Sequence, residues 1–406
     1  MPEPLATRCC IAGGGPAGVM LGFLLARAGI DVVVLEKHAD FFRDFRGDTI
    51  HPSTLQLMHE LGLLDAFLAR PHQEIREIRA QIGDTMLTVA DLRHVPTFSK
   101  FLALMPQWDF LNFLAENGRR YPKFRLLMET TATGPIVQGD VVCGVRAQTK
   151  DGPLDIRAEL VVGADGRSSA VRAAAGLTVI GIGAPMDVLW LRISRKPSDP
   201  AQILGRIDFG KLMVMLDRDD YWQCAYVIRK DAFEAIQSAG IEAFRAEIAA
   251  LVPWTADRLQ ELRDWGDVKL LTVTVDRLRE WYRPGLLCIG DAAHAMSPIG
   301  GVGINLAVQD AVAAANILYP AFVRGTPTVA DLRAVQRRRA FPMAVIQKLQ
   351  VVIQNGFLNR YLDAKSKMKP PFVVRLFAAL PVLRRIPGYV IGVGVRPEHI
   401  KTPDVG

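Results

Sequence analysis

Glycines followed by acidic residues are the features of this chain whose spacing indicates chemistry, and the first group lies near the amino terminus. The run Gly13–Gly18 (GGGPAG) lies between an apolar strand predicted over 8–12 and a helix predicted over 19–28. Gly13 permits a tight turn, and Gly15 allows the backbone to approach a pyrophosphate. The start of the helix offers free N–H groups and the positive end of its dipole to phosphates. This spacing predicts a dinucleotide-binding turn.

A second apolar strand is predicted over 31–35 and ends at Glu36, which is placed to accept hydrogen bonds from a ribose diol. Glycine-rich turns also occur without nucleotides, but the strand context and this acid favour the binding interpretation. The apolar stretch 11–26 after Arg8 is open to a second interpretation, as a signal peptide. Its glycines, Pro16 and its continuation into a strand argue against that alternative.

Two further acidic residues come directly after predicted strands. Asp165 lies in the run GADG after a strand over 160–163, and Asp291 lies in the run GDAAH after a strand over 286–289. An aspartate in this position can bind a sugar-alcohol hydroxyl, and the glycine loop that follows lets a flat ring lie against the backbone. A helix beginning near Gly303 would point its positive end at that ring. One large ligand that needs all three motifs is FAD, so a redox enzyme is predicted.

With these motifs, the chain resembles the FAD-dependent aromatic hydroxylase superfamily, the single-component flavoprotein monooxygenases related to p-hydroxybenzoate hydroxylase. The resemblance covers about residues 5–345, and the third motif is its most specific part. It implies contacts with the FAD pyrophosphate, its ribose, its ribityl chain and its ring. The residues that it implies for these contacts are Gly13, Gly15, Ala17, Gly18, Glu36, Arg46, Gln107, Asp165, Asp291, Pro298, Gly301, Gly303, Ile304 and Asn305.

Some of these residues also have a purely structural interpretation. Arg46 could form only a surface ion pair, and Gln107 could be an ordinary residue at a helix start. His294 is interpreted as a structural hydrogen-bonding residue rather than as a catalyst or metal ligand. No His/Cys cluster has zinc-like spacing, so no metal is predicted.

The resemblance also implies an activity. NADPH or NADH would be a transient reductant of FAD, and molecular oxygen would then form a C4a-hydroperoxyflavin that hydroxylates or epoxidises an apolar or aromatic small molecule. Arg46 would help to position the flavin, and no motif marks a substrate base. Two alternatives stay open: a flavin-dependent reductase or oxidase of the isoprenoid-reductase type, and a non-catalytic flavin-binding redox sensor.

The predicted fold is α/β, with a Rossmann-like FAD-binding domain, an inserted antiparallel-sheet substrate domain and a helical C-terminal tail. The FAD domain is expected at 1–75, 100–180 and 275–345, the substrate domain at 76–99 and 181–274, and the tail at 346–406. Strands of the substrate domain are predicted over 186–193, 204–217 and 221–228, and its helices over 232–251 and 255–262.

Side chains on those strands are the candidates for substrate contact: Met213, Met215, Tyr221, Gln223 and Tyr226. Alternation along a strand places Met213 and Met215 on one face, and places Tyr226 on the face opposite to Tyr221 and Gln223. Ordinary sheet packing is the favoured alternative for each. The scarcity of charge among these strands indicates an apolar substrate.

Composition limits the partners and the compartment. Five scattered cysteines without a framework spacing indicate a reducing, cytoplasmic environment. Residues 341–406 hold ten Lys/Arg and three acids, a difference of +7 that equals the net charge of the whole chain. No nucleic-acid-binding module accompanies these charges, so no nucleic-acid partner is predicted. The apolar, proline-broken stretch 370–387 is expected to pack on the FAD domain, and weak peripheral membrane contact is the alternative.

Overall fold

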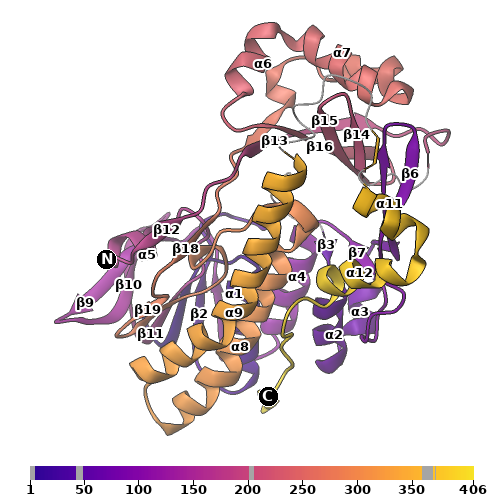
Figure 1. The fold of residues 1–406 in the computed structure, drawn as a ribbon. Helices are drawn as coiled ribbons and strands as arrows, with labels where there is room; N and C mark the ends of the chain where they lie inside the picture. Colours follow the sequence, from indigo (N-terminus) through magenta and orange to yellow (C-terminus); the bar gives the residue numbers. More distant parts are fainter. Residues whose placement is uncertain (1–4, 43–48, 201–204, 359–368, 371) are drawn as a thin grey trace.

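A computed structural model describes residues 5–42, 49–200, 205–358, 369–370 and 372–406. Two lobes share these residues (Figure 1): a larger body built around a mixed sheet, and a smaller lobe formed by a mostly antiparallel sheet, in which one strand pair is parallel, with helices on its outer side. The last helices of the chain lie at the side of the junction between the two lobes.

The sheet of the larger body has eight strands, and its centre has the order β20-β11-β1-β2-β8, all parallel. These central strands are apolar on both faces because helices or further strands cover each side. Its members are β1 (Leu5–Ala12), β2 (Val32–Leu35), β8 (Phe124–Leu127), β9 (Thr131–Gln138), β10 (Val141–Thr149), β11 (Gly152–Gly163), β19 (Tyr282–Arg283) and β20 (Leu286–Cys288). The strands predicted over 8–12, 31–35, 160–163 and 286–289 are therefore confirmed, with shifts of a few residues at their ends.

Helices α1, α4, α8 and α9 cover one side of this sheet, and α1 lies close against it. A Cβ added at Gly22 of α1 would come within 2.5 Å of Val34, so only glycine allows this approach. The helices of the larger body are α1 (Pro16–Arg27), α2 (Pro52–Glu60), α3 (Leu64–Leu68), α4 (Gln107–Gly118), α5 (Ala170–Ala174), α8 (Gly303–Arg324) and α9 (Val329–Ile353). Small sheets β3 (Thr49–Ile50), β7 (Leu102–Leu104) and β4 (Gln73–Ile75), and β12 (Val179–Gly181) with β18 (Asp276–Leu278), complete it.

Helix α8 is the central apolar helix of the body. Among the described residues, only the stretch 299–324 is long and apolar enough to cross a membrane, and 67% of its most apolar window is buried. That burial comes from packing against α1 and α9. We therefore interpret α8 as a core helix.

The smaller lobe is a seven-stranded sheet in the order β17-β13-β16-β15-β14-β5-β6. Two of its strands come from early in the chain and five from the segment after β12. They are β5 (Glu77–Ile82), β6 (Thr85–Asp91), β13 (Met186–Ser194), β14 (Gly205–Asp208), β15 (Lys211–Asp217), β16 (Tyr221–Arg229) and β17 (Lys269–Leu271), and the helices on them are α6 (Phe233–Ala239), α7 (Ile241–Leu251), η1 (Pro253–Glu261) and η2 (Trp265–Asp267).

Three predicted elements of this lobe are wrong in detail. The single strand over 204–217 is a hairpin, because Phe209 and Gly210 have φ of 47° and 75° and form a tight turn between β14 and β15. The single helix over 232–251 is interrupted at Gly240, whose φ is 91°. The helix over 255–262 is a 3₁₀ segment that begins at Pro253.

The C-terminal part of the chain joins both lobes. After α9 come η5 (Gln354–Leu358), α11 (Phe372–Ala379), η6 (Pro381–Arg384) and α12 (Arg385–Gly392). Helices α11 and α12 contact β6 of the smaller lobe. The last residues then cross the body, where Asn316 Nδ2 donates to the His399 carbonyl at 2.8 Å and Arg27 donates to the Thr402 carbonyl at 2.9 Å.

Candidate flavin site

The sequence motifs meet at one edge of the large sheet. Ala12, Leu35 and Gly163 are register partners at the ends of β1, β2 and β11, and Cys288 at the end of β20 pairs with Gly163. All four strands are parallel, so the residues after them, from Gly13 to Asp291, lie along the same carboxyl edge. In open α/β sheets this edge is where nucleotides bind.

The first motif forms a tight turn that leaves space outside it. Gly13 has φ of 114°, and an added Cβ would lie 2.3 Å from the Ala164 carbonyl oxygen. Gly15 caps α1 with extended backbone, and a Cβ added there would have no atom within 4 Å. The two glycines therefore differ: Gly13 is required by the protein's own packing, whereas no described residue fills the space beside Gly15.

Glu36 is held in place by the same turn. Its carboxylate accepts hydrogen bonds from the Gly14 N–H at 3.2 Å and from the His38 N–H at 3.0 Å. The side chain is buried at the end of β2, beside the glycine turn. This is the position from which an acid reaches the ribose of a bound dinucleotide.

The second and third motifs lie next to each other. Asp165 Oδ2 accepts from the Val171 N–H at 3.2 Å, and its buried Oδ1 has no hydrogen-bond partner among the described residues. Arg167 lies 3.6 Å from Asp291, and both side chains are partly exposed. Arg172, buried, forms an ion pair with Asp276 at 3.2 Å and donates to the Ala292 carbonyl at 3.3 Å. The two motifs are thus joined through two arginines.

A buried charge cluster supports the loop that carries Asp291. The Asp310 carboxylate accepts from the Gly290 N–H at 3.1 Å, contacts His294 Nε2 at 2.6 Å and accepts from Arg339 Nε at 2.9 Å. Burial alone raises the pKa of Asp310, but the charge and hydrogen bond of His294, with those of Arg339, bring it below its ordinary value. His294 therefore makes the buried hydrogen bond that a structural role requires, and that role stays a prediction. Sequence reasoning missed Arg339, because it lies in a run of three arginines that is typical of a solvated helix face.

The loop expected to flank the flavin ring is held by residues from far away in the sequence. Gly300 and Gly301 have φ of 78° and 62°, and Thr49 Oγ1 donates to the Gly301 carbonyl at 2.9 Å. Asn305 accepts from the His51 N–H at 2.9 Å and from Thr54 Oγ1 at 2.7 Å. Pro298 is exposed, Gly303 is partly exposed at the start of α8, and Ile304 is buried. No motif indicated the contribution of residues 49–54.

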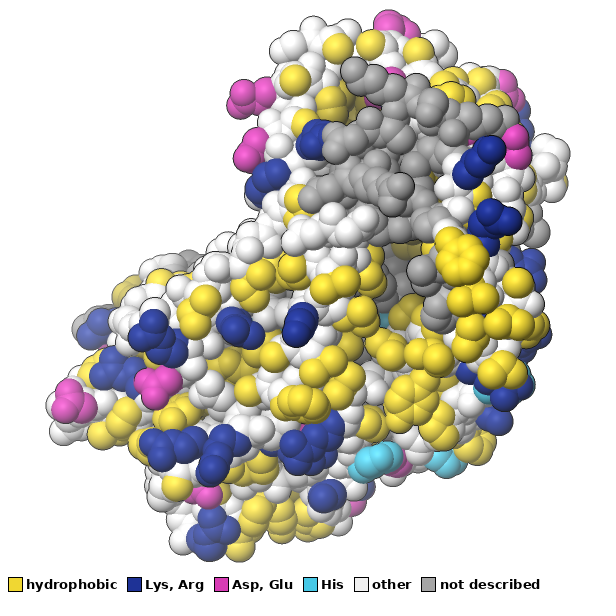
Figure 2. Space-filling view, in the orientation of Figure 1, with side chains coloured by type: hydrophobic (Ala, Val, Ile, Leu, Met, Phe, Trp, Pro, Cys, Tyr) yellow, Lys and Arg dark blue, Asp and Glu magenta, His cyan; other side chains and the backbone are white. Residues whose placement is uncertain are grey.

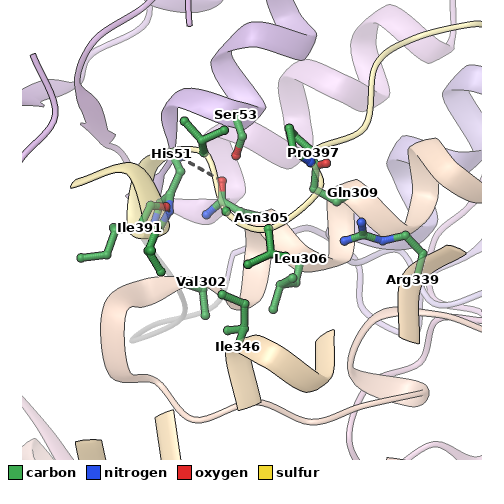
Figure 3. A pocket seen from close by; sticks show the side chains of 14 residues that line it. His51, Ser53, Val302, Asn305, Leu306, Gln309, Arg339, Ile346, Ile391 and Pro397 are labelled. Carbon is green, nitrogen blue, oxygen red and sulfur yellow. Dashed lines mark hydrogen bonds between the residues drawn. The ribbon is translucent and has the colours of Figure 1, made fainter. Parts of the chain in front are cut away.

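His51 connects this loop to the C-terminal helix α12. Its ring Nδ1 lies 2.6 Å from the Ile391 carbonyl, which can only accept, so Nδ1 carries the proton. Nε2 is buried without a partner among the described residues, as is Gln309 Nε2. Both residues line a cavity of about 30 Å³ between the start of α8 and α12 (Figure 3), which has room for a water molecule.

The buried ring of His51 makes stability depend on pH. Burial lowers its pKa from 6.5 to about 4, against the hydrogen bond to the Ile391 carbonyl, which raises it. Because the folded pKa lies below the unfolded one, this stabilisation is complete above the unfolded pKa and is lost as the pH falls. Urea unfolding should show a loss of about 2 kcal/mol between about pH 7 and about pH 5 from this residue. His51→Gln should remove this pH-dependent loss of unfolding free energy, whereas His59→Gln, at an exposed position, should retain it. If the unfolding free energy changed equally with pH in the unaltered protein and both variants, the loss could not be attributed to His51.

The remaining predicted cofactor residues differ in their location and exposure. Ala17 is buried in the first turn of α1, and Gly18 packs against the Gly13 carbonyl. Gln107 is the first residue of α4, where it is partly exposed. Arg46 lies outside the described residues.

The structure corrects the predicted substrate contacts. Met213, Met215 and Tyr226 are fully buried in the cluster between the sheet and α7, together with Phe244. The Tyr226 hydroxyl donates to Glu247 of α7 at 2.9 Å. These three side chains therefore face away from the larger body, because α7 covers that side of the sheet. The other face carries Tyr221 and Gln223.

The opposite face of the sheet is the one directed toward the flavin loop. Its cluster consists of Met186, Val188, Ala225, Val227, Val273 and Val275, and the partly buried residues packed on it are Ala184, Trp190, Leu212, Val214, Leu271 and Ile299. Ile299 belongs to the loop after Pro298, so this cluster joins the two lobes at the site. Alternation separates the two faces in the sequence but does not say which one a helix covers, and this explains the error.

The described residues fit the phosphates and sugars of FAD. Beside Gly15, Gly166 and Gly303, a Cβ would have no atom of the described chain within 4 Å, so these residues leave the backbone at all three motifs open to a ligand. The partnerless oxygen of Asp165 and the partly exposed Asp291 provide acceptors for hydroxyl groups. The start of α8 adds free N–H groups at the same edge. Among the described residues, no group of three His, Cys, Asp or Glu side chains is arranged to hold a metal ion.

Comparisons with known proteins agree with this fit. Residues 6–348 match the FAD binding domain family. The chain is 34% identical to 6-methylpretetramide 4-monooxygenase from Streptomyces rimosus over 397 residues, which cover 95% of this chain and 94% of that protein.

Solved structures share the fold. The p-nitrophenol 4-monooxygenase PnpA from Pseudomonas putida DLL-E4 matches with a TM-score of 0.77 at 20% identity, covering 97% of this chain and all of that one. OxyS anhydrotetracycline hydroxylase from Streptomyces rimosus matches with a TM-score of 0.73 at 22% identity, covering 96% of this chain and 76% of that one. The predicted α/β fold of the p-hydroxybenzoate hydroxylase type is thereby confirmed. The chain belongs to the FAD binding domain family and is an FAD-dependent monooxygenase.

Proposed function

We propose that this enzyme inserts one oxygen atom from O₂ into a flat, apolar aromatic molecule of several fused rings, with NADPH or NADH as the reductant. The apolar face of the seven-stranded sheet, directed at the flavin loop through Ile299, is the observation that carries this proposal. The relative named 6-methylpretetramide 4-monooxygenase supports an aromatic substrate.

The register of the sheet suggests where such a molecule would lie. Trp190, Ala225, Val214 and Gly205 are consecutive partners across β13, β16, β15 and β14. A large indole at one end is followed by small or medium side chains, which leave a shallow apolar surface. A flat ring system can contact such a surface over a large area, and burial of that area is favourable.

One end of this surface is polar. In the next row of the sheet, Arg192 pairs with Gln223, and the Arg192 guanidinium lies 4.8 Å from the centre of the Tyr221 ring. Hydroxyl or carbonyl groups on the edge of a substrate would meet hydrogen-bonding partners there. We therefore keep Tyr221 and Gln223 as proposed substrate contacts.

The placement of the proposed FAD and substrate sites indicates which segments of the chain bind each molecule. We propose that 1–75, 100–180 and 275–345 bind FAD, and that 76–99 and 181–274 form the substrate domain. FAD, when bound, supplies the oxygen-activating chemistry. The first turn of α8, at Gly303 to Asn305, would direct its N–H groups at the negative charge of the reduced cofactor. The apolar cluster around Ile299 would exclude water from the space between the lobes.

Two neighbouring residues on β15 provide a matched test of the sheet faces. Val214→Phe, on the face toward the flavin loop, should raise KM for the aromatic substrate about tenfold by filling its place, with little loss of stability. Met213→Ala, on the α7 face, should cost about 2–5 kcal/mol of unfolding free energy and leave KM unchanged. Steady-state kinetics and urea unfolding of both variants measure this; a KM effect in Met213→Ala alone would contradict the assignment.

The function itself is tested in two steps. Anaerobic titration of the FAD-loaded protein with NADPH and with NADH should bleach the flavin spectrum, and air should restore it. Turnover of a panel of polycyclic phenols under ¹⁸O₂ should then place the label in a product. Reduction of a substrate without label would favour the reductase alternative, and a flavin that neither nucleotide reduces, with or without substrate, would favour the sensor.

A further inference from the structure

We propose that the outer face of η6 and of helices α11 and α12 binds an anionic lipid surface next to the junction between the two lobes. Six apolar side chains of this segment are exposed. They are Phe372 (76%), Val382 (64%), Ile386 (57%), Leu380 (48%), Tyr389 (44%) and Leu376 (38%). Figure 2 shows hydrophobic side chains gathered at the right of the view, where these helices lie, with Lys and Arg at their margin.

The exposed face is not a by-product of loose packing. Gly388 of α12 lies so close to β6 that an added Cβ would come within 2.0 Å of the Asp91 carbonyl oxygen, and one at Gly392 would come within 2.9 Å of Leu92. The inner face of α12 is thus fixed on the protein. The apolar residues of the outer face contribute little to the packing of α12 on β6, so the stability of the fold does not explain why they are apolar.

The positive charge of residues 369–397 favours an anionic lipid surface over a second copy of the chain as the partner. From Lys369 to Pro397 the sequence has five Lys/Arg and no acidic residue. A second copy of the chain in a symmetric dimer would place these charges against the same charges. An anionic lipid surface instead complements the arginines, while its acyl region accepts the apolar side chains.

The exposed apolar face of α12 lies close to the flavin loop, so contact with lipid would serve substrate access. Val390 and Val395, on and after α12, pack against a cluster that contains Met296 and Val302 of the loop expected to flank the flavin and Leu306 of α8. A membrane-bound α12 would therefore hold this loop, at the junction between the lobes, close to the bilayer. An apolar aromatic substrate dissolved in lipid could then enter without crossing water.

Sedimentation of the FAD-loaded protein with vesicles tests the proposal. Binding to phosphatidylcholine vesicles that contain phosphatidylglycerol should exceed binding to pure phosphatidylcholine about tenfold and should weaken with added salt. Arg384→Glu with Arg385→Glu should abolish the difference, and Phe372→Ser with Ile386→Ser should weaken binding at every salt concentration. The flavin spectrum and NAD(P)H oxidation in solution report whether each variant is folded, independently of lipid.

Matched variants elsewhere separate this face from the general positive charge. Arg119→Glu with Arg120→Glu reverses two exposed neighbouring arginines after α4, and Val323→Ser removes an apolar side chain that is 65% exposed on α8. Both should bind vesicles like the unaltered protein. Equal losses in the control arginine pair, no preference for anionic vesicles, or a dimer in solution that Phe372→Ser with Ile386→Ser dissociates would overturn the proposal.

Discussion

Replacement of Gly15 by leucine is expected to abolish FAD binding while the polypeptide stays folded. The backbone of Gly15 is extended, with φ of −75° and ψ of −175°, so a side chain causes no strain there. No atom of the residues that the structure describes lies within 4 Å of an added Cβ. The leucine side chain would project into the space where the pyrophosphate is proposed to lie. The Kd for FAD should rise at least about 100-fold, or ~2.7 kcal/mol.

The measurement is titration of the apoprotein with FAD, followed by flavin fluorescence, together with thermal unfolding of the apoprotein. Loss of a glycine N-cap should cost the apoprotein no more than about 1 kcal/mol. Gly181→Leu is the matched control, because Gly181 also has open space around it but lies in β12, away from the glycine turn. Gly13→Ala should differ from both, since its Cβ would meet the Ala164 backbone and should lower stability as well as FAD affinity. Unchanged FAD affinity in Gly15→Leu would refute the proposed cofactor position.

The sheet edge that carries Gly15 could be predicted from the sequence because its signals are local. An apolar run that ends in glycine or an acid indicates a buried strand and the turn after it, and parallel strands bring such ends together. Gly13, Glu36, Asp165 and Asp291 each follow a strand of this kind. Their alignment required only that the strands be parallel neighbours.

The hydrogen bonds that hold the flavin loop in place could not be predicted, because they join residues that are far apart in the sequence. Thr49 and His51 bind residues about 250 positions further on, and His51 reaches Ile391 across 340 positions. The hydrophobic periodicity of the sequence does not indicate such a pairing. The faces of the substrate sheet posed a related problem, since Met213 and Val214 are equally apolar and only the placement of α7 distinguishes them. The hairpin at Phe209 was missed because an aromatic residue at the turn continued the apolar pattern.

Replacement of Asp310 by alanine is the change expected to cost the most stability at the site. Asp310 and Arg339 are almost fully buried, and the carboxylate also accepts from Gly290 and contacts His294. Alanine would leave the Arg339 charge in the interior, where Glu398, at 3.3 Å, is its one remaining acidic partner among the described residues. Breaking a buried pair in this way costs about 3–5 kcal/mol. Because the Gly290 N–H loses its acceptor directly before Asp291, FAD should also dissociate at a lower temperature.

Urea unfolding and thermal release of FAD measure both effects, and two variants decide their cause. Asp310→Asn can still accept from the Gly290 N–H but cannot neutralise Arg339, so it should retain part of the FAD affinity and lose most of the stability. Asp31→Ala removes a half-exposed pair with Arg125 at 3.0 Å and should cost less than about 1 kcal/mol. A cost in Asp310→Ala no larger than in Asp31→Ala would contradict the buried-pair account.

The pH dependence provides a separate check on Asp310. Its folded pKa lies below the ordinary value, so its stabilisation is present above the unfolded pKa of about 3.9 and is lost only as the pH falls through the folded pKa. The difference between the unaltered protein and Asp310→Ala should therefore persist through the pH range in which His51 acts, and should close only in stronger acid. The two buried groups thus act in separate pH windows: His51 weakens the contact between α12 and the flavin loop first, while Asp310 still holds the loop that carries Asp291.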